Sequence, residues 1–309
     1  MDFLRMLEGI RTPVLDGFMS VVTYLGSEIL FMALAVLVFW CVSKKQGYYL
    51  FAVGLAGVVI NQFLKLWFRI PRPWVLDPNF SIVESARAEA TGYSFPSGHT
   101  QNIVGTLGVI AVSNRQKWVR VLCIVFILLV PFSRMYLGVH TPLDVCVSFG
   151  VALLLIALFY PTFKNDETFA KRMPLILALL VGMAAAYTLF VLSYSFPADV
   201  DEANLQSGIH NAFTMTGAML GLVVSYIFDR KVLNFKTKAP FVGQALKLVL
   251  GLGLVVALRA VLKAPLLALF NGSEVASLVR YFIMVVFAGC VWPATFPFFA
   301  RIGRKKEAC

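Results

Sequence analysis

The chain consists of long apolar stretches separated by short polar segments, most of which are basic. A helix needs about 17–25 mostly apolar residues to cross a bilayer. Nine stretches come close to this length, and we expect one helix in each of residues 18–42, 48–68, 98–113, 119–138, 142–161, 173–195, 209–228, 242–262 and 278–299. The pattern therefore predicts an all-α, polytopic membrane helix bundle with about nine transmembrane helices.

Three segments are not regular spans. The third stretch, 98–113, is short, so we expect it to begin at a helix end that is buried in protein. Residues 1–17 mix polar and apolar positions, which is typical of a short helix at the membrane interface. The basic turn KNDETFAKR, residues 164–172, is the best internal boundary. We therefore expect a catalytic membrane core at 1–161 and a C-terminal four-helix membrane extension at 162–309.

The basic residues predict how the bundle is oriented. Loops after the odd-numbered spans, together with the C-terminal tail, hold most of the 27 Lys and Arg residues. The loop segment 196–206, on the other side, has none. Because Lys and Arg are enriched in cytoplasmic loops, we expect the C-terminus in the cytoplasm and the N-terminus outside. The loops at 69–97, 196–208 and 263–277 would then face outward.

Composition supports a membrane protein and excludes several other classes. Hydrophobic residues make up 59% of the chain and charged residues 14%, against roughly 25% charged in soluble domains. The net charge of +11 does not indicate nucleic acid, because the basic residues lie in short clusters between apolar stretches. The five cysteines show no metal-ligand spacing, and we expect them to act as small hydrophobic residues.

Three basic side chains lie at the ends of apolar stretches: Lys65, Arg72 and Arg134. A charge inside a membrane costs about 2.5–3.5 kcal/mol on insertion scales, so such residues are usually paired or functional. No equal set of acidic residues lies near them in the sequence. Because a guanidinium group can donate two parallel hydrogen bonds to phosphate, the three cations indicate an anion-binding site.

The segment YSFPSGHTQN, residues 93–102, offers a second part of such a site. Ser97, Gly98 and His99 begin the third apolar stretch. A helix N-terminus presents unpaired N–H groups and the positive end of the helix dipole, and glycine lets an anion approach closely. Alone, the segment would more often be a turn and a helix cap. Together with the three cations it describes a phosphate cradle.

His140 and Asp144 are four residues apart, which places them on one face of a helix that begins near Thr141. A carboxylate beside an imidazole fixes its tautomer and leaves the other ring nitrogen free as a nucleophile or a base. His99, on a different element, could serve as the opposing acid. One histidine would then attack phosphorus while the other protonates the leaving oxygen.

These residues form three motifs: Lys-x6-Arg-Pro from Lys65, Pro-Ser-Gly-His from Pro96, and Ser-Arg-x5-His-x3-Asp from Ser133. In this order they resemble the signature motifs of the type 2 phosphatidic acid phosphatase superfamily. That superfamily includes lipid phosphate phosphatases, undecaprenyl diphosphate phosphatases, glucose-6-phosphatase and vanadium haloperoxidases. The resemblance covers about residues 45–160, and the expected spans make the soluble haloperoxidase branch a poor match.

The resemblance implies a role for each motif residue. His140 would be the nucleophile that forms a phosphohistidine, Asp144 would orient it, and His99 would protonate the leaving group and later activate water. The phosphoryl oxygens would be held by Lys65, Arg72, Ser97, Gly98 and Arg134. Phosphatases of this kind need no metal, so the resemblance implies no cofactor.

We therefore expect a multi-pass phosphatase of the cell membrane, with its active site facing outside. Its substrate would be a lipid phosphate or diphosphate, with undecaprenyl diphosphate favoured and phosphatidic acid or a similar lipid next. Two alternatives stay open: a lipid phosphotransferase that uses the same intermediate, and a non-catalytic phospholipid transporter or binding protein. The sequence indicates membrane lipids and no nucleic acid as partners, and it leaves the oligomeric state open.

Other polar residues on the predicted outer side have simpler interpretations beside functional ones. His210 begins the seventh span, where it is either a helix-start histidine near the headgroups or, with Asn211, part of the rim of the substrate site. Arg69 is more simply an interfacial residue than a phosphate ligand. Snorkelling is the simpler interpretation for three cations near the last outer loop, which are Arg259, Lys263 and Arg280.

Overall fold

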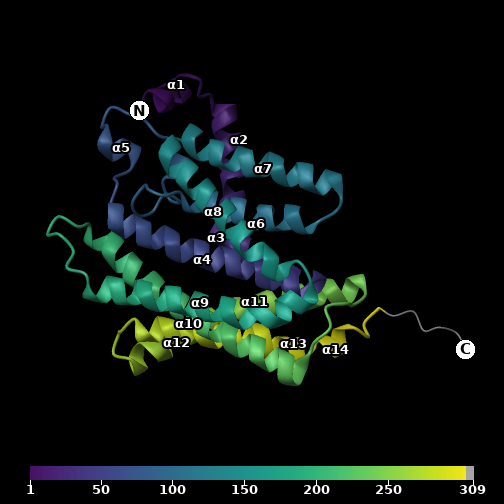
Figure 1. Ribbon diagram of the computed structural model, residues 1–309. Helices are drawn as coiled ribbons and strands as arrows, with labels where there is room; N and C mark the ends of the chain where they lie inside the picture. The colour runs from purple at the N-terminus through teal and green to yellow at the C-terminus, as the bar shows by residue number, and fades with distance from the viewer. Residues whose placement is uncertain (304–309) are drawn as a thin grey trace, which may run out of the picture. The chain divides into compact units, whose positions relative to one another are not determined.

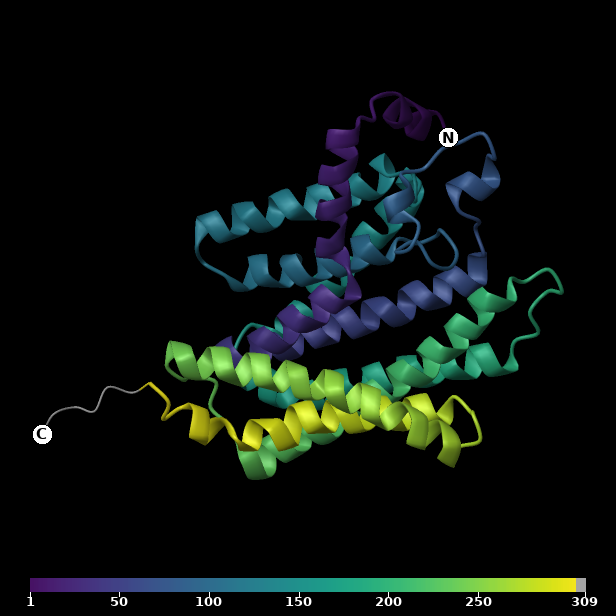
Figure 2. The same ribbon diagram turned by 180° about the vertical axis from the view of Figure 1, so that it is seen from behind.

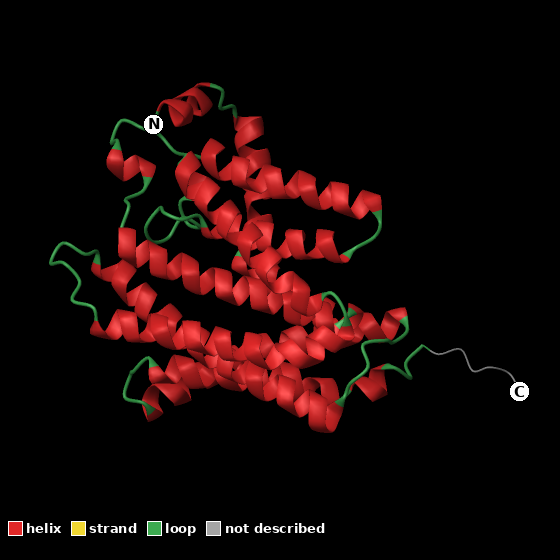
Figure 3. Ribbon diagram, viewed as in Figure 1, coloured by secondary structure: helices red, strands yellow, loops and turns green. Residues whose placement is uncertain are grey.

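A computed structural model describes residues 1–303 of the chain. In this part of the chain the regular secondary structure is helical and no strand is present (Figure 3). The α-helices are α1 (Asp2–Gly9), α2 (Pro13–Thr23), α3 (Glu28–Leu37), α4 (Lys44–Phe68), α5 (Pro73–Leu76), α6 (Gly98–Ser113), α7 (Lys117–Tyr136), α8 (Pro142–Phe163), α9 (Asp166–Ser193), α10 (Glu202–Phe228), α11 (Phe241–Leu269), α12 (Val275–Val286), α13 (Trp292–Ala294) and α14 (Phe296–Phe299). The predicted all-α class is confirmed.

Within residues 1–303, seven helices are long and apolar enough to cross a membrane, which confirms a multi-pass membrane protein. The first expected span, 18–42, belongs to the helix pair Pro13–Gly26 and Glu28–Val42, which bends by 50° and raises the count to at most eight. The third expected span is α6, which has only 16 residues and is mostly buried. The expected count of nine is therefore not confirmed for the described residues.

The orientation of the termini stays a prediction. Part of it rests on the basic residues of the C-terminal tail. Three of these lie outside the described residues: Arg304, Lys305 and Lys306.

The chain packs into two compact units that alternate along the sequence. Unit 1 contains Met1–Leu34, Tyr49–Asn165 and Tyr194–Gly208. Unit 2 contains Ala35–Tyr48, Asp166–Ser193 and the chain from Ile209 onward. All three sequence motifs fall in unit 1. The functional division expected between residues 161 and 162 stays a prediction.

Unit 1 is built around three consecutive helices, α6, α7 and α8. Helices α6 and α7 lie side by side in both ribbon views (Figures 1 and 2), and α6 also packs against α8. Glycine permits this close packing, because a side chain on Gly108 of α6 would come within 2.5 Å of Ile156 on α8. The apolar cluster between these helices and α2 consists of Val22, Ile103, Val104, Ile127, Val130 and Ala152.

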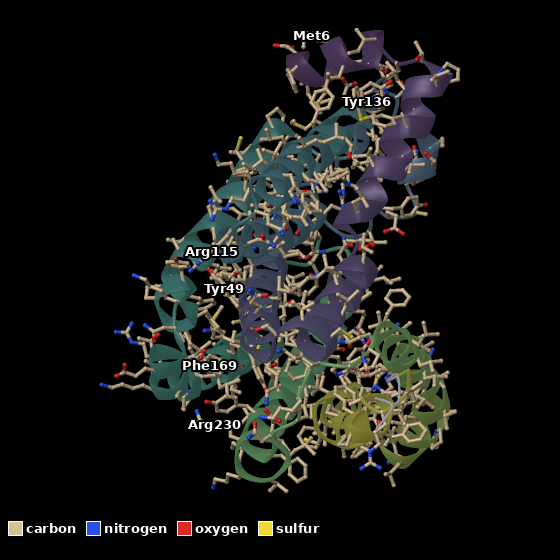
Figure 4. The ribbon with its side chains drawn as sticks, turned by 90° about the vertical axis from the view of Figure 1, so that its right-hand side faces the viewer. Met6, Tyr49, Arg115, Tyr136, Phe169 and Arg230 are labelled. Atoms are coloured by element: carbon tan, nitrogen blue, oxygen red, sulfur yellow. The ribbon has the colours of Figure 1, made fainter. Side chains whose placement is uncertain are left out.

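The N-terminal segment forms the short helix α1, which is tied to the loop after α5. Its Arg5 pairs with Asp77 at 2.5 Å. Figure 4 shows Met6 of α1 and Tyr136 at the same end of unit 1, and Arg115, which precedes α7, far from them. Helix α1 therefore lies at the end of α7 that carries the third motif.

Unit 2 contains α9, α10, α11 and α12, with irregular turns at several helix ends. Lys247 of α11 is only 1% exposed, and it donates hydrogen bonds of 2.9 Å to the carbonyl oxygens of Trp40 and Thr237. Its charge is thus held by backbone carbonyls. The π-helical turns of the unit are Val38–Val42, Asp229–Leu233 and Phe287–Val291.

Helices α10 and α12 approach each other closely at two glycines of α10. A side chain on Gly217 would meet the carbonyl oxygen of Leu278 at 2.1 Å, and one on Gly221 would meet that of Phe282 at 2.9 Å. Backbone atoms cannot move aside as the end of a flexible side chain can. We therefore expect that only glycine fits at position 217 without a shift of α12.

We predict that Gly217→Ala destabilises unit 2 by about 1–3 kcal/mol, because the new methyl group forces the two helices apart. Thermal unfolding of the purified protein in detergent measures the effect. Gly182→Ala in α9 is the matched control, since nothing lies within 4 Å of a side chain there. Equal unfolding temperatures for the two variants would contradict the close packing of α10 and α12.

Candidate active site

The residues expected to form the cradle and the catalytic pair all lie in unit 1, at the ends of consecutive helices. Helix α4 ends where Arg69 adopts a left-handed conformation, with φ of 49°, and Pro71 follows. The structure places Lys65 in the last turn of α4, Arg72 before α5, Ser97, Gly98 and His99 at the start of α6, Arg134 in the last turn of α7, and His140 and Asp144 at the start of α8.

Asp144 holds the imidazole of His140 from one side. Its Oδ2 atom lies 3.3 Å from His140 Nδ1 and accepts hydrogen bonds from the Thr141 amide at 2.8 Å and the Ser94 hydroxyl at 2.5 Å. The Thr141 hydroxyl accepts from the Asp144 amide in return, which completes a capping box at the start of α8. The same local motif that begins the helix therefore orients the carboxylate, while His140 itself lies just before the helix and not on its face.

Arg72 occupies the other side of the His140 ring. Its Nη1 atom lies 3.0 Å from His140 Nε2 and donates to the Val139 carbonyl at 2.9 Å. The rest of the guanidinium donates to the carbonyl oxygens of Gly92 at 2.9 Å and Thr91 at 2.6 Å. The buried Arg72 is thus fixed by backbone groups, and no carboxylate among residues 1–303 pairs with it.

Lys65 and Arg134 are buried as well, but they are held differently. Lys65 donates to the Tyr93 carbonyl, in the same loop that binds Arg72. Arg134 is fully buried and donates from Nη1 to the Thr23 hydroxyl at 2.8 Å. Its Nε and Nη2 atoms have no hydrogen-bond partner among the described residues. Arg134 therefore keeps donors available for a bound anion.

The start of α6 combines a helix cap with a link to the catalytic pair. The Ser97 hydroxyl accepts from the Thr100 amide at 3.4 Å, and the Ser97 amide donates to the Asp144 carbonyl at 3.2 Å. A side chain on Gly98 would meet only Asn61, at 4.0 Å, so the space beside this helix end is open. The geometry suits an anion at the N-terminus of α6.

His99 faces an acidic residue, Glu89, that belongs to none of the three sequence motifs. Its Nε2 atom lies 3.7 Å from a carboxylate oxygen of Glu89 and has no hydrogen-bond partner in the described part of the chain. Thr23 and Ser94 were likewise missed. Of these, only Ser94 is near a motif, and its hydroxyl is common in turns, so no sequence signal distinguished it.

His210 and Asn211 lie in unit 2, apart in sequence and in unit from the other expected site residues. His210 Nδ1 lies 2.8 Å from a carboxylate oxygen of Glu274. Their role at a substrate rim stays a prediction. Within residues 1–303, no group of three His, Cys, Asp or Glu side chains is placed to hold a metal ion.

The electrostatics of the site centre on His140, which follows α7 and is 1% exposed. Burial lowers its pKa well below the ordinary histidine value, and the charges of Arg72, Arg134 and Lys65, together with the nearby His99 imidazole, lower that pKa further. These four groups therefore lie near one imidazole, and their use as a phosphate cradle stays a prediction. A neutral His140 keeps a ring nitrogen that can act as a nucleophile.

Comparison with known proteins finds two family matches. Residues 45–168 match the PAP2 superfamily, and residues 213–304 match the transmembrane extension of PAP2 superfamily phosphatases. The chain is 36% identical to undecaprenyl-diphosphatase BcrC of Bacillus subtilis (strain 168) over 166 residues, which cover 52% of this chain and 81% of that protein.

Two further relatives extend the comparison. Phosphatidylglycerophosphatase B of the same organism is 31% identical over 162 residues, 48% of this chain and 75% of that protein. Sphingosine-1-phosphate phosphatase 1 of Mus musculus is 28% identical over 258 residues, 78% of this chain and 58% of that protein. No solved structure matches the chain.

We predict that His140 stays neutral at pH values where an ordinary histidine, with a pKa of about 6.5, is half protonated. NMR titration is practical because the chain has only three histidines. Because the unfolded chain takes up this proton as the pH falls and the folded chain does not, acid should also reduce stability through His140.

Arg72→Gln should raise the pKa of His140, because it removes the charge nearest to the ring. Arg69→Gln is the matched control, since Arg69 donates only to the carbonyl oxygens of Leu66 and Trp67 at the end of its own helix. An ordinary His140 titration in the unmodified protein would contradict the buried, cation-lined environment.

Proposed function

Since this chain belongs to the PAP2 superfamily and is an integral-membrane phosphatase, we propose that it hydrolyses a lipid phosphate or diphosphate through a phosphohistidine intermediate. The observation that carries the proposal is the fixed arrangement Arg72–His140–Asp144. A buried, neutral imidazole is held by a carboxylate on Nδ1, and its Nε2 lies beside a guanidinium. This is the arrangement that a histidine nucleophile for phosphorus needs.

The reaction would proceed in two steps. His140 Nε2 forms a bond to phosphorus as the bond to the leaving oxygen breaks, and a protonated His99 transfers its proton to that oxygen. Water then attacks the phosphohistidine, His99 takes a proton from the water, and the N–P bond breaks to release phosphate. Burial and the charges of three cations, Arg134, Arg72 and Lys65, lower the pKa of His99. Its protonated form would therefore depend on the negative charge of the bound phosphate, with Glu89 3.7 Å from His99 Nε2 as the nearby carboxylate.

The cradle would bind the phosphoryl oxygens throughout both steps. Arg134 offers unpartnered, buried guanidinium donors, and Ser97 and Gly98 place the start of α6 beside open space. Arg72 and Lys65 add positive charge that is held in place by loop carbonyls. Because these donors are fixed before the substrate arrives, little reorganisation opposes charge development in the transition state.

We favour undecaprenyl diphosphate as the substrate, with phosphatidic acid or a similar lipid next. The first choice is supported by the 36% identity to an undecaprenyl-diphosphatase, and a phosphatidylglycerophosphatase at 31% supports the wider class. We also propose that the protein resides in the cell membrane with its active site outside, which is supported by the distribution of basic residues in the loops.

We predict that His140→Ala abolishes phosphate release from undecaprenyl diphosphate and that His99→Ala slows it by about 10²–10⁴-fold, the typical contribution of a general acid or base. Rates are measured with the purified protein in detergent, alongside phosphatidic acid. Arg72→Gln should be severely impaired and Arg69→Gln close to the unmodified protein. Substantial turnover by a folded His140→Ala variant would remove His140 as the nucleophile.

The proposed orientation has its own test. An epitope tag inserted in the acidic loop after Asp201 should be reached by antibody on intact cells, because this loop is expected outside. A tag inserted after Asn165, in the basic turn between α8 and α9, should be reached only after the membrane is permeabilised. The reverse pattern would place the active site on the cytoplasmic face.

A further inference from the structure

Arg280, in the membrane-spanning helix α12, is a largely buried cation that forms no salt bridge within residues 1–303. The residue is 7% exposed, and its Nε atom is buried without a hydrogen-bond partner among the described residues. The centroid of the Tyr281 ring lies 5.3 Å from the guanidinium carbon. A charge in such a place is costly unless an anion or several acceptors compensate for it.

The sequence favoured snorkelling for three cations near the last outer loop, and Arg280 differs from the other two. Arg259 and Lys263 of α11 are exposed, whereas Arg280 is buried as far as its Nε atom. A snorkelling side chain buries its stem and keeps its charged end accessible. Arg280 is therefore the cation of this group whose guanidinium is partly enclosed by the packed helices.

Arg280 belongs to a polar seam where α10 and α12 pack. Ser277, one turn earlier, shares the buried side of α12 with Arg280, and its hydroxyl lies 3.4 Å from His210 Nδ1 on α10. Thr214 follows His210 by one turn and precedes the contact glycine Gly217. Its hydroxyl is also buried and unpartnered in the described residues. We call His210, Thr214, Ser277 and Arg280 the α10–α12 seam.

The acidic residue beside the seam, Glu274, is paired with His210. Glu274 lies 2.8 Å from His210 Nδ1, and no salt bridge to Arg280 is formed within residues 1–303. Glu274 is six residues before Arg280, which places the two side chains about a third of a turn apart around the helix axis. The seam thus combines a cation, two hydroxyl groups and no free carboxylate, and this set of donors suits an anion with several oxygens.

We propose that the α10–α12 seam binds the phosphate group of an anionic membrane phospholipid. Arg280 would pair with the phosphate, and Ser277 and Thr214 would donate hydrogen bonds to its oxygens. Arg280 is five residues after the first residue of α12, about 8 Å along the helix axis. This depth suits a lipid phosphate at the membrane interface, whose acyl chains can lie against the apolar outer surface of α10 or α12.

The seam is distinct from the phosphate cradle, because it lies in unit 2 and the cradle in unit 1. The proposal therefore does not depend on the catalytic assignment. The bound lipid is a partner and not a substrate of this site, since the seam carries no nucleophile aligned by a carboxylate. Its effect would be to compensate the charge of Arg280 and to hold α10 against α12.

The test uses the full-length protein in nanodiscs of phosphatidylcholine that contain phosphatidylglycerol, followed by native mass spectrometry of retained lipid. The cradle is intact in every variant, so lipid bound there contributes equally. The unmodified protein and Arg259→Gln should each retain one more phosphatidylglycerol molecule per protein than Arg280→Gln. The Arg280 change should reduce the affinity of the seam for this lipid about tenfold or more. Equal retention by all three would overturn the proposal.

Two further measurements separate the other outcomes. If Arg280→Gln does not fold, the milder double variant Ser277→Ala/Thr214→Val is used instead. If this variant retains as much phosphatidylglycerol as the unmodified protein, the proposal is overturned. The second measurement is thermal unfolding of the protein in detergent, with and without inorganic phosphate. Stabilisation by phosphate that Arg280→Gln abolishes, without retained phosphatidylglycerol, would overturn the lipid assignment in favour of a free anion.

Discussion

The end of unit 1 that carries the three motifs depends on one interaction, the binding of the buried Arg72 guanidinium by backbone carbonyl oxygens. Thr91, Gly92 and Val139 supply these acceptors, and Tyr93 does the same for Lys65. Regular helices consume their own carbonyls, so a cation at this depth needs irregular backbone beside it. The loop between α5 and α6 is therefore part of the site, because its carbonyls hold the positive charges that a phosphate would meet.

The same constraint accounts for the helix lengths around the site. Helix α6 has only 16 residues because its first turn is buried at the motif, where Ser97 caps it and the Ser97 amide reaches the Asp144 carbonyl. The capping box that begins α8 also positions the carboxylate beside His140. At these positions the residues that cap a helix also position the proposed site residues. Short, fixed spacings in the sequence are informative for this reason.

Those spacings explain what the sequence could predict and what it could not. The contact between His140 and Asp144 is local, so the four-residue spacing could indicate it. It arises from the cap of α8 and not from a shared helical face, because His140 precedes the N-cap Thr141. Other contacts of the site depend on how separate segments pack, which no local pattern encodes. Thr23 accepts a hydrogen bond from Arg134, 111 positions away in the sequence, and Glu89 lies beside His99. The sequence also did not predict the bend between α2 and α3 or that α6 is too short to span. The length of an apolar stretch alone cannot distinguish a full membrane span from a buried or broken helix.

Buried cations in the two units differ in how their charge is compensated, and this difference separates structural roles from binding roles. Lys247 donates to two carbonyl oxygens and needs nothing more than the protein provides. Arg134 is as deeply buried, yet its Nε and Nη2 atoms have no partner among the described residues. Arg280 is 7% exposed, and its buried Nε atom likewise has no partner there. Because an uncompensated buried charge is strongly unfavourable, such residues persist where a ligand completes the set of acceptors. For Arg134 that ligand would be the phosphoryl group of the proposed reaction, and the same reasoning, applied to Arg280, favours the anion that we propose for unit 2.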